Sequence, residues 1–286
     1  MEFQFQVCER GEWGKFPEGR LYERKLDGTR ALAVKLGDMV KLINRRGFEY
    51  TEQFPEIVAD MRTYPHHALI LDGEICDRDF STLAGRTHLQ DRFKTEMRAK
   101  LHPCTLWVFD VLQVGVSKVA DQPLSARKQA LEELGERGQV KILRPEPLET
   151  LLAEVEAKRI EGVIAKDPSS RYEFRRSTAW LKFRREEAED LLIIGYEDTD
   201  KPTRPFRSLI FRRGEREVQA SSGLSEDDLR MLDEVFAKEP KRRVGTKWYF
   251  DNPRFVAEVK FFGGSEIPYR FPSVVRLKLE NPFKEV

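Results

Sequence analysis

The sequence has little cysteine. Its 286 residues include three, Cys8, Cys76 and Cys104, and no two of them form a Cys-x-x-Cys pair. Structural zinc sites and disulfide frameworks both need cysteines at close or regular spacing. The scatter therefore argues against a zinc ribbon and against a small fold stapled by disulfides.

Long apolar runs and an excess of one charge are lacking as well. No apolar run reaches the length of about 20 residues that spans a bilayer, and Met1-Glu2-Phe3-Gln4 does not begin a signal peptide. We therefore expect a cytoplasmic protein with no membrane contact. Because the net charge is only +1, any binding of nucleic acid must come from basic side chains gathered into patches.

The length and the apolar share allow real hydrophobic cores. A chain of 286 residues with 40% hydrophobic residues suits one large soluble domain or two ordinary ones. Its character changes at the acidic run 186–190, which follows a basic segment and which we interpret as a hinge. We predict a first domain over residues 1–186 and a second over residues 187–286.

Short alternating segments dominate the second domain. With a turn at 214–215, the pattern predicts strands over 191–196, 208–213, 217–221, 254–262 and 274–279. Ser225 and Asp228 have the spacing of a capping box, which would begin a helix that runs to about residue 237. About five strands and one helix fit a small OB-type barrel, with a β-sandwich as the structural alternative.

The first domain mixes strands and helices. Glycines and a proline break residues 1–20, where we expect no regular element. One helix should start at Pro55, and another should be capped by Ser125 and run to about residue 137. Further helical segments are expected within 81–100 and 150–159. Apolar and alternating runs predict strands over 31–36, 39–43, 68–71, 105–112 and 161–166.

One stretch, 23–30, sets Lys25 beside a tight turn at Asp27-Gly28, at the mouth of a strand. A lysine is most often a surface cation, but it becomes a covalent nucleophile if its amine loses its proton near neutral pH. At an unperturbed pKa that loss costs about 4.6 kcal/mol at pH 7. Neighbouring cations, such as Arg24 and Arg30, or a bound metal ion would lower this cost.

The pattern Lys-x-Asp-Gly-x-Arg at 25–30 resembles the first motif of the covalent nucleotidyltransferases, which include ATP-dependent DNA ligases, RNA ligases and mRNA capping enzymes. Four fixed positions suggest this family without deciding it. The family's lysine carries the nucleotide, which implies that Lys25 is adenylated. The resemblance also implies that Glu23 reads the adenine and that Arg30 contacts the nucleotide's sugar or the nicked strand.

Three further segments follow in the family's order. The turn at 44–47 is similar to a Ser-Arg-x-Gly element that binds the nucleotide, with Arg45 at the arginine and Asn44 in place of the serine. Read alone, it is equally well two solvated arginines. The segment 71–74, read alone an Asp-Gly turn at a strand end, resembles a motif whose glutamate serves the metal, here Glu74. Phe109 matches a phenylalanine that stacks on adenine.

The segment 161–166, Glu-Gly-Val-Ile-Ala-Lys, predicts a strand with an acid at its start. Alternation places Glu161, Val163 and Ala165 on one face. The segment resembles a motif whose glutamate holds a divalent metal, which implies that role for Glu161. By the same resemblance, Val163 or Ile164 forms an apolar wall against the base, and Lys166 also lies at the nucleotide.

Residues 171–185 are the most basic stretch, and within it Trp180, Lys182 and Arg184 alternate onto one face. This segment resembles a motif in which two basic residues bind the nucleotide phosphate. Arg184 stands where a lysine is usual, and it has a planar guanidinium group in place of an amine. A basic sheet surface that only touches DNA phosphates is the alternative. Our DNA-binding candidates are Arg46, Arg171, Arg175, Arg176, Arg212 and Arg213.

The stretch 270–280 is similar to the last ligase motif, Arg-x-Pro-x-x-x-Arg-x-Arg-x-Asp. Arg270, Pro272 and Arg276 match, whereas Lys278 and Glu280 are replacements of the same charge. Family members use this element on the pyrophosphate of ATP. The resemblance therefore implies that Arg270, Arg276 and Lys278 bind ATP.

These elements follow the family's order over nearly the whole chain, and they identify it as a member of the ligase family. The resemblance implies an α+β fold: a nucleotidyltransferase domain (ATP-grasp-like, antiparallel sheets with flanking helices), then a small all-β OB-fold barrel, with no separate DNA-binding domain in front. It implies an ATP-dependent DNA ligase of DNA repair or non-homologous end joining. Such an enzyme uses ATP and Mg²⁺ or Mn²⁺, and it forms first a lysyl-AMP and then a 5′-adenylated DNA.

The same resemblance implies the partners. The substrate is nicked double-stranded DNA, a Ku-like end-binding protein is the expected partner, and the protein is expected to be a monomer. In the family the OB domain closes over ATP and then turns onto the duplex, and the hinge at 186–190 fits such a motion.

Two rival functions stay open. RNA ligases and capping guanylyltransferases share Lys-x-Asp-Gly, although 71–74 and 270–280 match DNA ligases better. An OB-fold binder of single strands with an inactive transferase domain would have no need of Lys25, Glu74 and Glu161. NAD-dependent DNA ligases carry a four-cysteine zinc module, and the scattered cysteines separate this chain from them.

Overall fold

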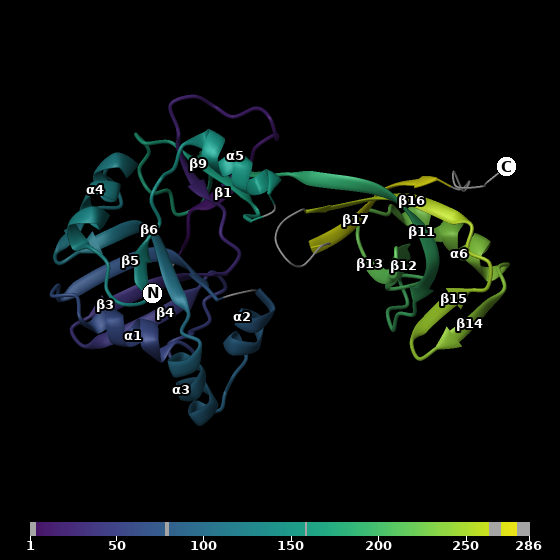
Figure 1. The fold of residues 1–286 in the computed structure, drawn as a ribbon, viewed down its shortest axis with the longest axis horizontal. Helices are drawn as coiled ribbons and strands as arrows, with labels where there is room; N and C mark the ends of the chain where they lie inside the picture. The colour runs from purple at the N-terminus through teal and green to yellow at the C-terminus, as the bar shows by residue number, and fades with distance from the viewer. Residues whose placement is uncertain (1–3, 78–79, 158, 263–269, 279–286) are drawn as a thin grey trace. The chain divides into compact units, whose positions relative to one another are not determined.

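The computed structural model describes residues 4–77, 80–157, 159–262 and 270–278. Contacts between residues divide the chain into two compact units, residues 1–184 and 185–286, which are drawn in Figure 1. The sequence placed a domain boundary between residues 186 and 187. Among the described residues, no helix combines the length and the apolar character that crossing a membrane requires.

The larger sheet of the first unit is mostly antiparallel. Its order is β4-β3-β5-β6-β7, and β8 pairs in parallel with β6. The strands predicted over 31–36 and 39–43 are confirmed and form the hairpin of β3 and β4, with the Leu36↔Met39 pair next to its turn. The strands of this sheet are β3 (Thr29–Leu36), β4 (Met39–Asn44), β5 (Ala68–Cys76), β6 (Thr105–Val114), β7 (Ser117–Lys118) and β8 (Val140–Ile142).

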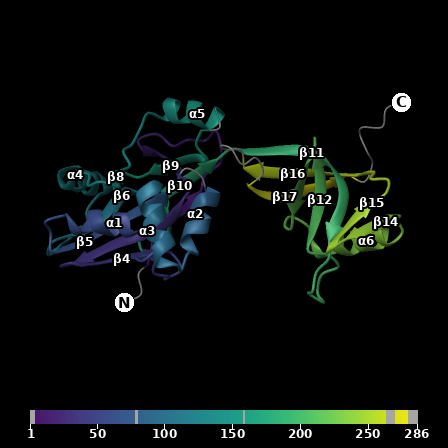
Figure 2. The ribbon, with the colours of Figure 1, turned by 60° about the horizontal axis from the view of Figure 1, so that its bottom comes forward.

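Helices flank the sheets of the first unit. Figures 1 and 2 show α2 and α3 beside one another, and α4 packs on β6. The helices of this unit are α1 (Pro55–Arg62), α2 (Phe80–Thr87), α3 (Arg92–Leu101), α4 (Leu124–Leu134) and α5 (Leu148–Glu156).

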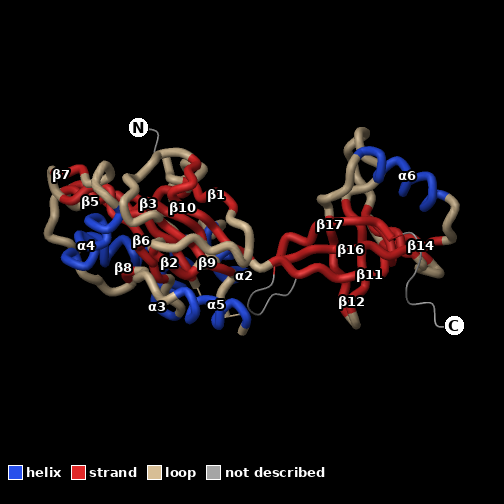
Figure 3. Tube along the Cα trace, turned by 90° about the horizontal axis from the view of Figure 1, so that it is seen from above, coloured by secondary structure: helices blue, strands red, loops and turns tan. Residues whose placement is uncertain are grey.

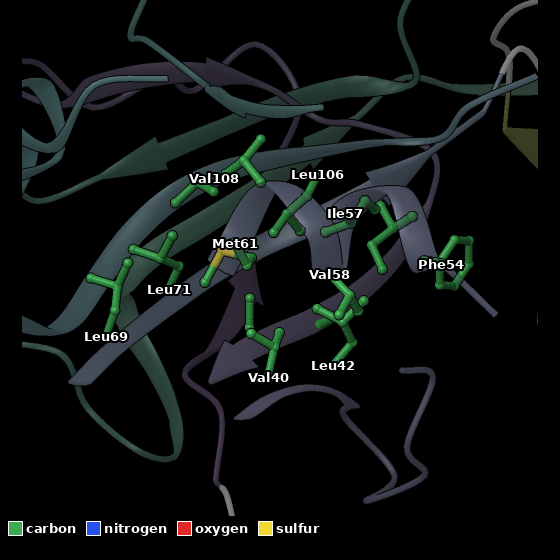
Figure 4. Packing of buried hydrophobic residues seen from close by; sticks show 14 of the residues in the cluster. Val40, Leu42, Phe54, Ile57, Val58, Met61, Leu69, Leu71, Leu106 and Val108 are labelled. Atoms are coloured by element: carbon green, nitrogen blue, oxygen red, sulfur yellow. The ribbon is translucent and has the colours of Figure 1, made fainter. Parts of the chain in front are cut away.

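The main core of the first unit lies between α1 and the larger sheet. The helix begins at Pro55, as predicted, because the first helical position needs no backbone N–H and suits the fixed φ of proline. One face of α1 carries the buried Ile57, Val58 and Met61. Figure 4 shows these side chains among apolar residues of the sheet, such as Leu71.

The smaller sheet of the first unit has the order β1-β10-β9-β2. Its strands are β1 (Val7–Arg10), β2 (Leu21–Arg24), β9 (Gly162–Lys166) and β10 (Arg176–Arg184). The expectation of no regular element in 1–20 was wrong, because β1 pairs in parallel with β10, far along the chain. Strand pairing across so many residues leaves no local signal in the sequence.

Two other local expectations need correction. Asp72 and Glu74 do not end a strand, because β5 continues through them to Cys76 and pairs Glu74 with Arg30 on β3. The helix expected to be capped by Ser125 begins one residue earlier, at Leu124, and its N-cap position is Pro123, which makes no side-chain cap. A proline before the first turn fixes the chain direction without donating a hydrogen bond.

The second unit is a mostly antiparallel seven-stranded sheet with helix α6 (Glu226–Ala237). Strands form most of it in Figure 3. Its strands are β11 (Glu186–Glu197), β12 (Ser208–Arg213), β13 (Arg216–Ala220), β14 (Lys241–Val244), β15 (Lys247–Phe250), β16 (Phe255–Phe262) and β17 (Arg270–Lys278). The capping box of Ser225 and Asp228 is confirmed. About five strands were expected, and the hairpin of β14 and β15 was missed.

The acidic run 186–190 forms no irregular hinge. It is the first part of β11 and pairs antiparallel with β16, from Glu186↔Phe262 to Asp190↔Glu258. Three of its acids form ion pairs within the unit: Glu186 with Lys260, Glu189 with Arg213, and Asp190 with Lys278. Only residue 185 lies outside the strands between β10 and β11. The acidic composition therefore reflects cross-strand pairing.

Candidate functional site

A cavity of about 540 Å³ opens in the first unit, between the smaller sheet and the near ends of β3, β5 and β6. Its volume is that of a small-molecule site. It gathers eleven of the predicted side chains: Glu23, Lys25, Arg30, Arg45, Arg46, Glu74, Phe109, Ile164, Lys166, Lys182 and Arg184. Segments up to 160 residues apart in the sequence thus meet around one space.

Lys25 lies in the loop after β2, in contact with the start of β9. Its backbone N–H donates to the carbonyl of Gly162 at 2.9 Å, and its side-chain Nζ donates to Glu161 Oε2. The other oxygen, Oε1, lies 2.7 Å from Arg184 Nη2. The Glu161 side chain is 8% exposed. One nearly buried carboxylate therefore binds two of the cations that were predicted to do chemistry.

Glu161 turns to the side opposite to the one that alternation predicted. It precedes the first residue of β9, Gly162, so the alternation of the strand does not reach it. Val163 and Ala165 are fully buried in a core cluster on the other side of the sheet. Of the two alternatives for an apolar wall, Ile164 lines the cavity, whereas Val163 packs into this core.

Glu74 lies on β5 near the turn that carries Gly28. A Cβ atom at Gly28 would lie 2.2 Å from the Ile75 carbonyl oxygen, so only glycine fits there. Burial raises the pKa of Glu74 to about 7, and the charges of Asp72 and Glu161 act in the same direction. Among the described residues, no group of three or more His, Cys, Asp or Glu side chains could hold a metal ion. The two acids that the sequence predicted as metal ligands, Glu74 and Glu161, are close enough for the charge of Glu161 to act on Glu74.

Arg30 is tied into a buried network. Its guanidinium binds both carboxylate oxygens of Asp72, at 3.0 and 2.6 Å, and donates to the Gln6 carbonyl at 2.6 Å. Tyr172 donates its hydroxyl to the same Asp72 at 2.7 Å. Burial alone would lower the pKa of Arg30, but the charge and hydrogen bonds of Asp72 outweigh it and raise the pKa. The network fixes one wall of the cavity.

The aromatic end of the cavity is formed by Phe109 and Trp180, whose rings meet edge to face at 5.9 Å. The Nζ of Lys166 lies 4.3 Å from the centre of the first ring and 4.1 Å from the centre of the second. Burial lowers the pKa of Lys166, although the charge of Glu23 acts in the opposite direction by stabilising the ammonium form. Apolar rings with a few buried charges are typical of the end of a pocket that receives a base.

Glu23 connects this end to a residue that the sequence analysis missed. Its Oε2 lies 2.7 Å from Lys166 Nζ, and its Oε1 forms an ion pair with Lys128 of α4. Burial alone would raise the pKa of Glu23, but the charges and hydrogen bonds of Lys128 and Lys166 outweigh it and lower the pKa. None of the motifs contains Lys128. The sequence around it is also what an exposed lysine on an amphipathic helix would have, so no local signal distinguished it.

The remaining cations of the cavity come from β10 and from the turn after β4. Burial, with a smaller contribution from Arg184, lowers the pKa of Lys182. In the turn, the side chain of Asn44 accepts hydrogen bonds from the backbone N–H groups of Arg46 and Phe48, at 2.8 and 2.9 Å. Asn44 thus holds the turn that brings Arg45 and Arg46 to the cavity.

The other predicted cations lie elsewhere. Arg171, Arg175 and Arg176 are exposed on the first unit. In the second unit Arg212 is exposed, and Arg213 forms an ion pair with Glu189. Also in that unit, Arg276 lies 3.1 Å from Glu258, and Lys278 lies 2.5 Å from Asp190. The Arg270 side chain and the whole of Glu280 lie outside the described residues.

Comparison with known proteins gives a family and relatives. A family model described as an ATP dependent DNA ligase domain matches residues 12–184. The chain is 30% identical over 279 residues to a probable DNA ligase of Sorangium cellulosum, which covers 90% of this chain and 51% of that protein. It is 27% identical to DNA ligase 1 of Methanosarcina mazei, with coverages of 92% and 52%. The chain spans about half the length of these curated relatives.

Solved structures show the same fold. The ligase domain of LigD from M. tuberculosis matches 99% of this chain and 98% of its own, with a TM-score of 0.54 at 22% identity. A structure from the Lig E DNA ligases matches 97% and 100%, with a TM-score of 0.68 at 16% identity. The predicted α+β class, a nucleotidyltransferase fold followed by an OB fold, is confirmed.

Proposed function

The chain belongs to the ATP-dependent DNA ligase domain family, and from this premise we propose that it is itself an ATP-dependent DNA ligase that seals nicks in duplex DNA. The observation that carries the proposal is the position of Lys25. Its amine faces a cavity of nucleotide size and is bound to a carboxylate, with Lys182 and Arg184 on the same cavity wall.

In the first step the amine of Lys25 attacks the α-phosphate of ATP. A P–N bond forms, the bond from the α-phosphorus to the bridging oxygen breaks, and pyrophosphate leaves. The attacking amine must first lose a proton, and Glu161 Oε2, which accepts its hydrogen bond, is the nearest acceptor. Lys182 and Arg184 then balance the charge that develops on the phosphate oxygens, which is the main contribution a protein makes to phosphoryl transfer.

The two carboxylates Glu74 and Glu161 fit a divalent ion such as Mg²⁺ or Mn²⁺. Their charges act on each other, and Mg²⁺ typically takes one or two protein carboxylates together with phosphate oxygens of the substrate. When bound, the ion would neutralise phosphate charge. Glu161 would then contact both the ion and Lys25. The protonation of the Lys25 amine would therefore depend on whether the ion is bound.

The base of ATP fits the end of the cavity lined by Phe109, Trp180 and Ile164. Apolar and aromatic surface there favours a planar ring, and Glu23 offers an acceptor at the same end. Arg30 stays engaged with Asp72 and lines the path from the base to Lys25. We assign Arg45 to the ATP and Arg46 to the DNA.

In the second step AMP passes from Lys25 to the 5′-phosphate at a nick. In the third, the 3′-hydroxyl attacks that phosphate and AMP leaves. Arg171, Arg175 and Arg176 are exposed cations that suit DNA phosphates, and we assign Arg212 and Arg213 the same role. We assign Arg270, Arg276 and Lys278 to the pyrophosphate of ATP. We further propose a cytoplasmic monomer that acts in repair or end joining, with a Ku-like protein as its partner.

The test is covalent labelling. The full chain is incubated with ATP labelled at the α-phosphate and with Mg²⁺, and the protein is separated under denaturing conditions. We expect a labelled band for the wild type and none for Lys25→Ala. The matched control is Lys41→Ala, because Lys41 lies on the exposed side of β4, paired with Glu49. The labelled protein is then chased with nicked DNA or nicked RNA.

Each outcome decides between functions. Loss of the label with sealing of nicked DNA supports the DNA ligase. Discharge by RNA alone favours an RNA ligase, and labelling by GTP in place of ATP favours a capping enzyme. If the wild type, free of bound AMP, takes no label, the non-enzymatic alternative, a nucleic-acid binder, is favoured.

A further inference from the structure

We infer that Lys128, a residue of α4 outside every ligase motif, is a positioning residue that sets the base specificity of the cavity by fixing the carboxylate of Glu23. The inference rests on the proposed function, since it concerns which nucleotide reaches Lys25. It assigns a role to a side chain that is not itself among those lining the cavity.

Lys128 joins two pieces of the cavity wall from behind. Its Nζ donates to the carbonyl oxygen of Leu143 at 3.0 Å and forms an ion pair with Glu23 Oε1. Leu143 and Glu23 both line the cavity. The Lys128 side chain is 12% exposed and that of Glu23 is 1% exposed, so water competes little for either contact.

The helix holds Lys128 in a fixed place. Its buried face carries Leu124, Arg127 and Leu131, and Lys128 lies one turn from both leucines on that face. The neighbouring Arg127 binds Asp110 of β6 through two hydrogen bonds, at 2.7 and 2.9 Å, and neither side chain is exposed. The ammonium of Lys128 is therefore anchored to the sheet that carries Phe109.

The carboxylate of Glu23 is held from both sides. Lys128 faces Oε1, and Lys166 lies 2.7 Å from Oε2. Two cations around one acid keep it ionised despite burial, and an ionised carboxylate can only accept hydrogen bonds. The rotation of the carboxylate is also restricted, because each oxygen has its own partner.

A fixed acceptor distinguishes adenine from guanine. Adenine presents an exocyclic amine that donates, whereas guanine presents a carbonyl oxygen at the equivalent position. A buried carboxylate that meets that oxygen would repel it and lose an expected hydrogen bond, and sites of this kind discriminate strongly. Without Lys128, Lys166 is the one cation that the described residues place at this carboxylate, so the carboxylate can rotate or take up a proton and then donate to guanine.

The experiment compares Lys128→Met, Lys128→Gln and Lys128→Arg in the full chain. Initial rates of covalent labelling are measured over a range of concentrations of labelled ATP and of labelled GTP. We expect the two neutral variants to lower the ATP-to-GTP ratio of kcat/KM by about tenfold or more, chiefly through a higher KM for ATP. Lys128→Arg keeps the charge and should restore most of the ratio.

Two controls separate this role from general damage to the fold. Lys141→Met removes a lysine of β8 that is 39% exposed and lies 3.4 Å from Glu136, and it should leave the ratio unchanged. The far-ultraviolet circular dichroism spectrum of each Lys128 variant should match that of the wild type, which shows that the variants are folded.

Several results would overturn the inference. If kcat/KM for ATP and for GTP fall equally, Lys128 is structural. The same holds if the circular dichroism spectra of the neutral variants depart from that of the wild type, or if Lys128→Arg behaves like Lys128→Met. If the wild type is labelled and seals nicks but the Lys128 variants keep the wild-type ATP-to-GTP ratio, this inference alone is refuted. If the wild type takes no label, the proposed function is refuted and this inference with it.

Discussion

The side-chain amine of Lys25 donates a hydrogen bond to Glu161, 136 residues further along the chain. The other oxygen of that carboxylate contacts Arg184. Both cations project into the cavity. Glu161 thus contacts the proposed nucleophile and one proposed phosphate-binding residue at the same time.

Replacing Glu161 by Gln should strongly slow the first step. The amide keeps the shape, but it removes the charge that orients Lys25 and the oxygen that would accept its proton. We expect the rate of covalent labelling to fall by about 100-fold or more. Glu132→Gln, at an exposed acid paired with Arg144, is the control and should label normally. Normal labelling by the Glu161 variant would refute the role.

We expect Glu74 to make covalent labelling depend on pH. Its pKa is raised to about 7, so below pH 7 it is largely neutral and a poor ligand for a cation. We expect the Mg²⁺-dependent rate to fall as the pH drops from 8 to 6, and high Mg²⁺ to shift the midpoint downwards because the ion favours the charged form. If the midpoint of this pH dependence does not change with the concentration of Mg²⁺, Glu74 is not a metal ligand.

The same shift predicts an opposite effect on stability. Because the folded pKa lies above the ordinary glutamate value, the native state prefers the neutral carboxyl. The free energy of unfolding should therefore fall as the pH rises from about 4.3 towards 7 and stay lower above it. Glu74→Gln removes this loss and should raise the melting temperature of the first unit by roughly 3–6 °C at pH 8, but not at pH 4. A variant that is less stable than the wild type at pH 8 would contradict this.

Arg127 and Asp110 form an ion pair in which neither side chain is exposed. Arg127→Met would leave the carboxylate buried without its partner, and we expect the free energy of unfolding of the first unit to drop by about 3–5 kcal/mol. Arg144→Met breaks an exposed pair and should cost at most about 1 kcal/mol. Urea unfolding, with hydrogen exchange of the β6 amides as the probe, measures the loss of unfolding free energy in both variants. Equal losses would mean that the buried pair contributes no more than the exposed one.

Arg276 of β17 is predicted to act on the pyrophosphate of ATP and so in the first step alone. Its side chain is 65% exposed and pairs with Glu258 at 3.1 Å, so its loss should cost little stability. We expect Arg276→Ala to lower covalent labelling by about tenfold and to leave sealing of a preadenylated nick unchanged. Arg242→Ala, at an exposed arginine of β14, is the control. Equal loss in both assays would place Arg276 on the DNA instead.

The sequence by itself determined the features that depend on neighbouring residues. Pro55 begins a helix because of its own ring, and Ser225 and Asp228 form a capping box within one turn. The ligase motifs are equally local, since each places its candidate side chains within a few positions, and those at 25–30, 44–47, 71–74 and 161–166 include a glycine. The family and eleven of the side chains that line the cavity could therefore be predicted from the chain alone.

Only the tertiary structure decided what depends on distant partners. Strand β1 exists because β10 pairs with it, and the acidic run 186–190 is a strand because β16 lies opposite. The choice of Ile164 over Val163, and the place of Lys128 behind Glu23, follow from which surface each side chain meets. A sequence pattern records how a residue relates to its neighbours along the chain, whereas burial and ion pairing depend on residues that only folding brings near.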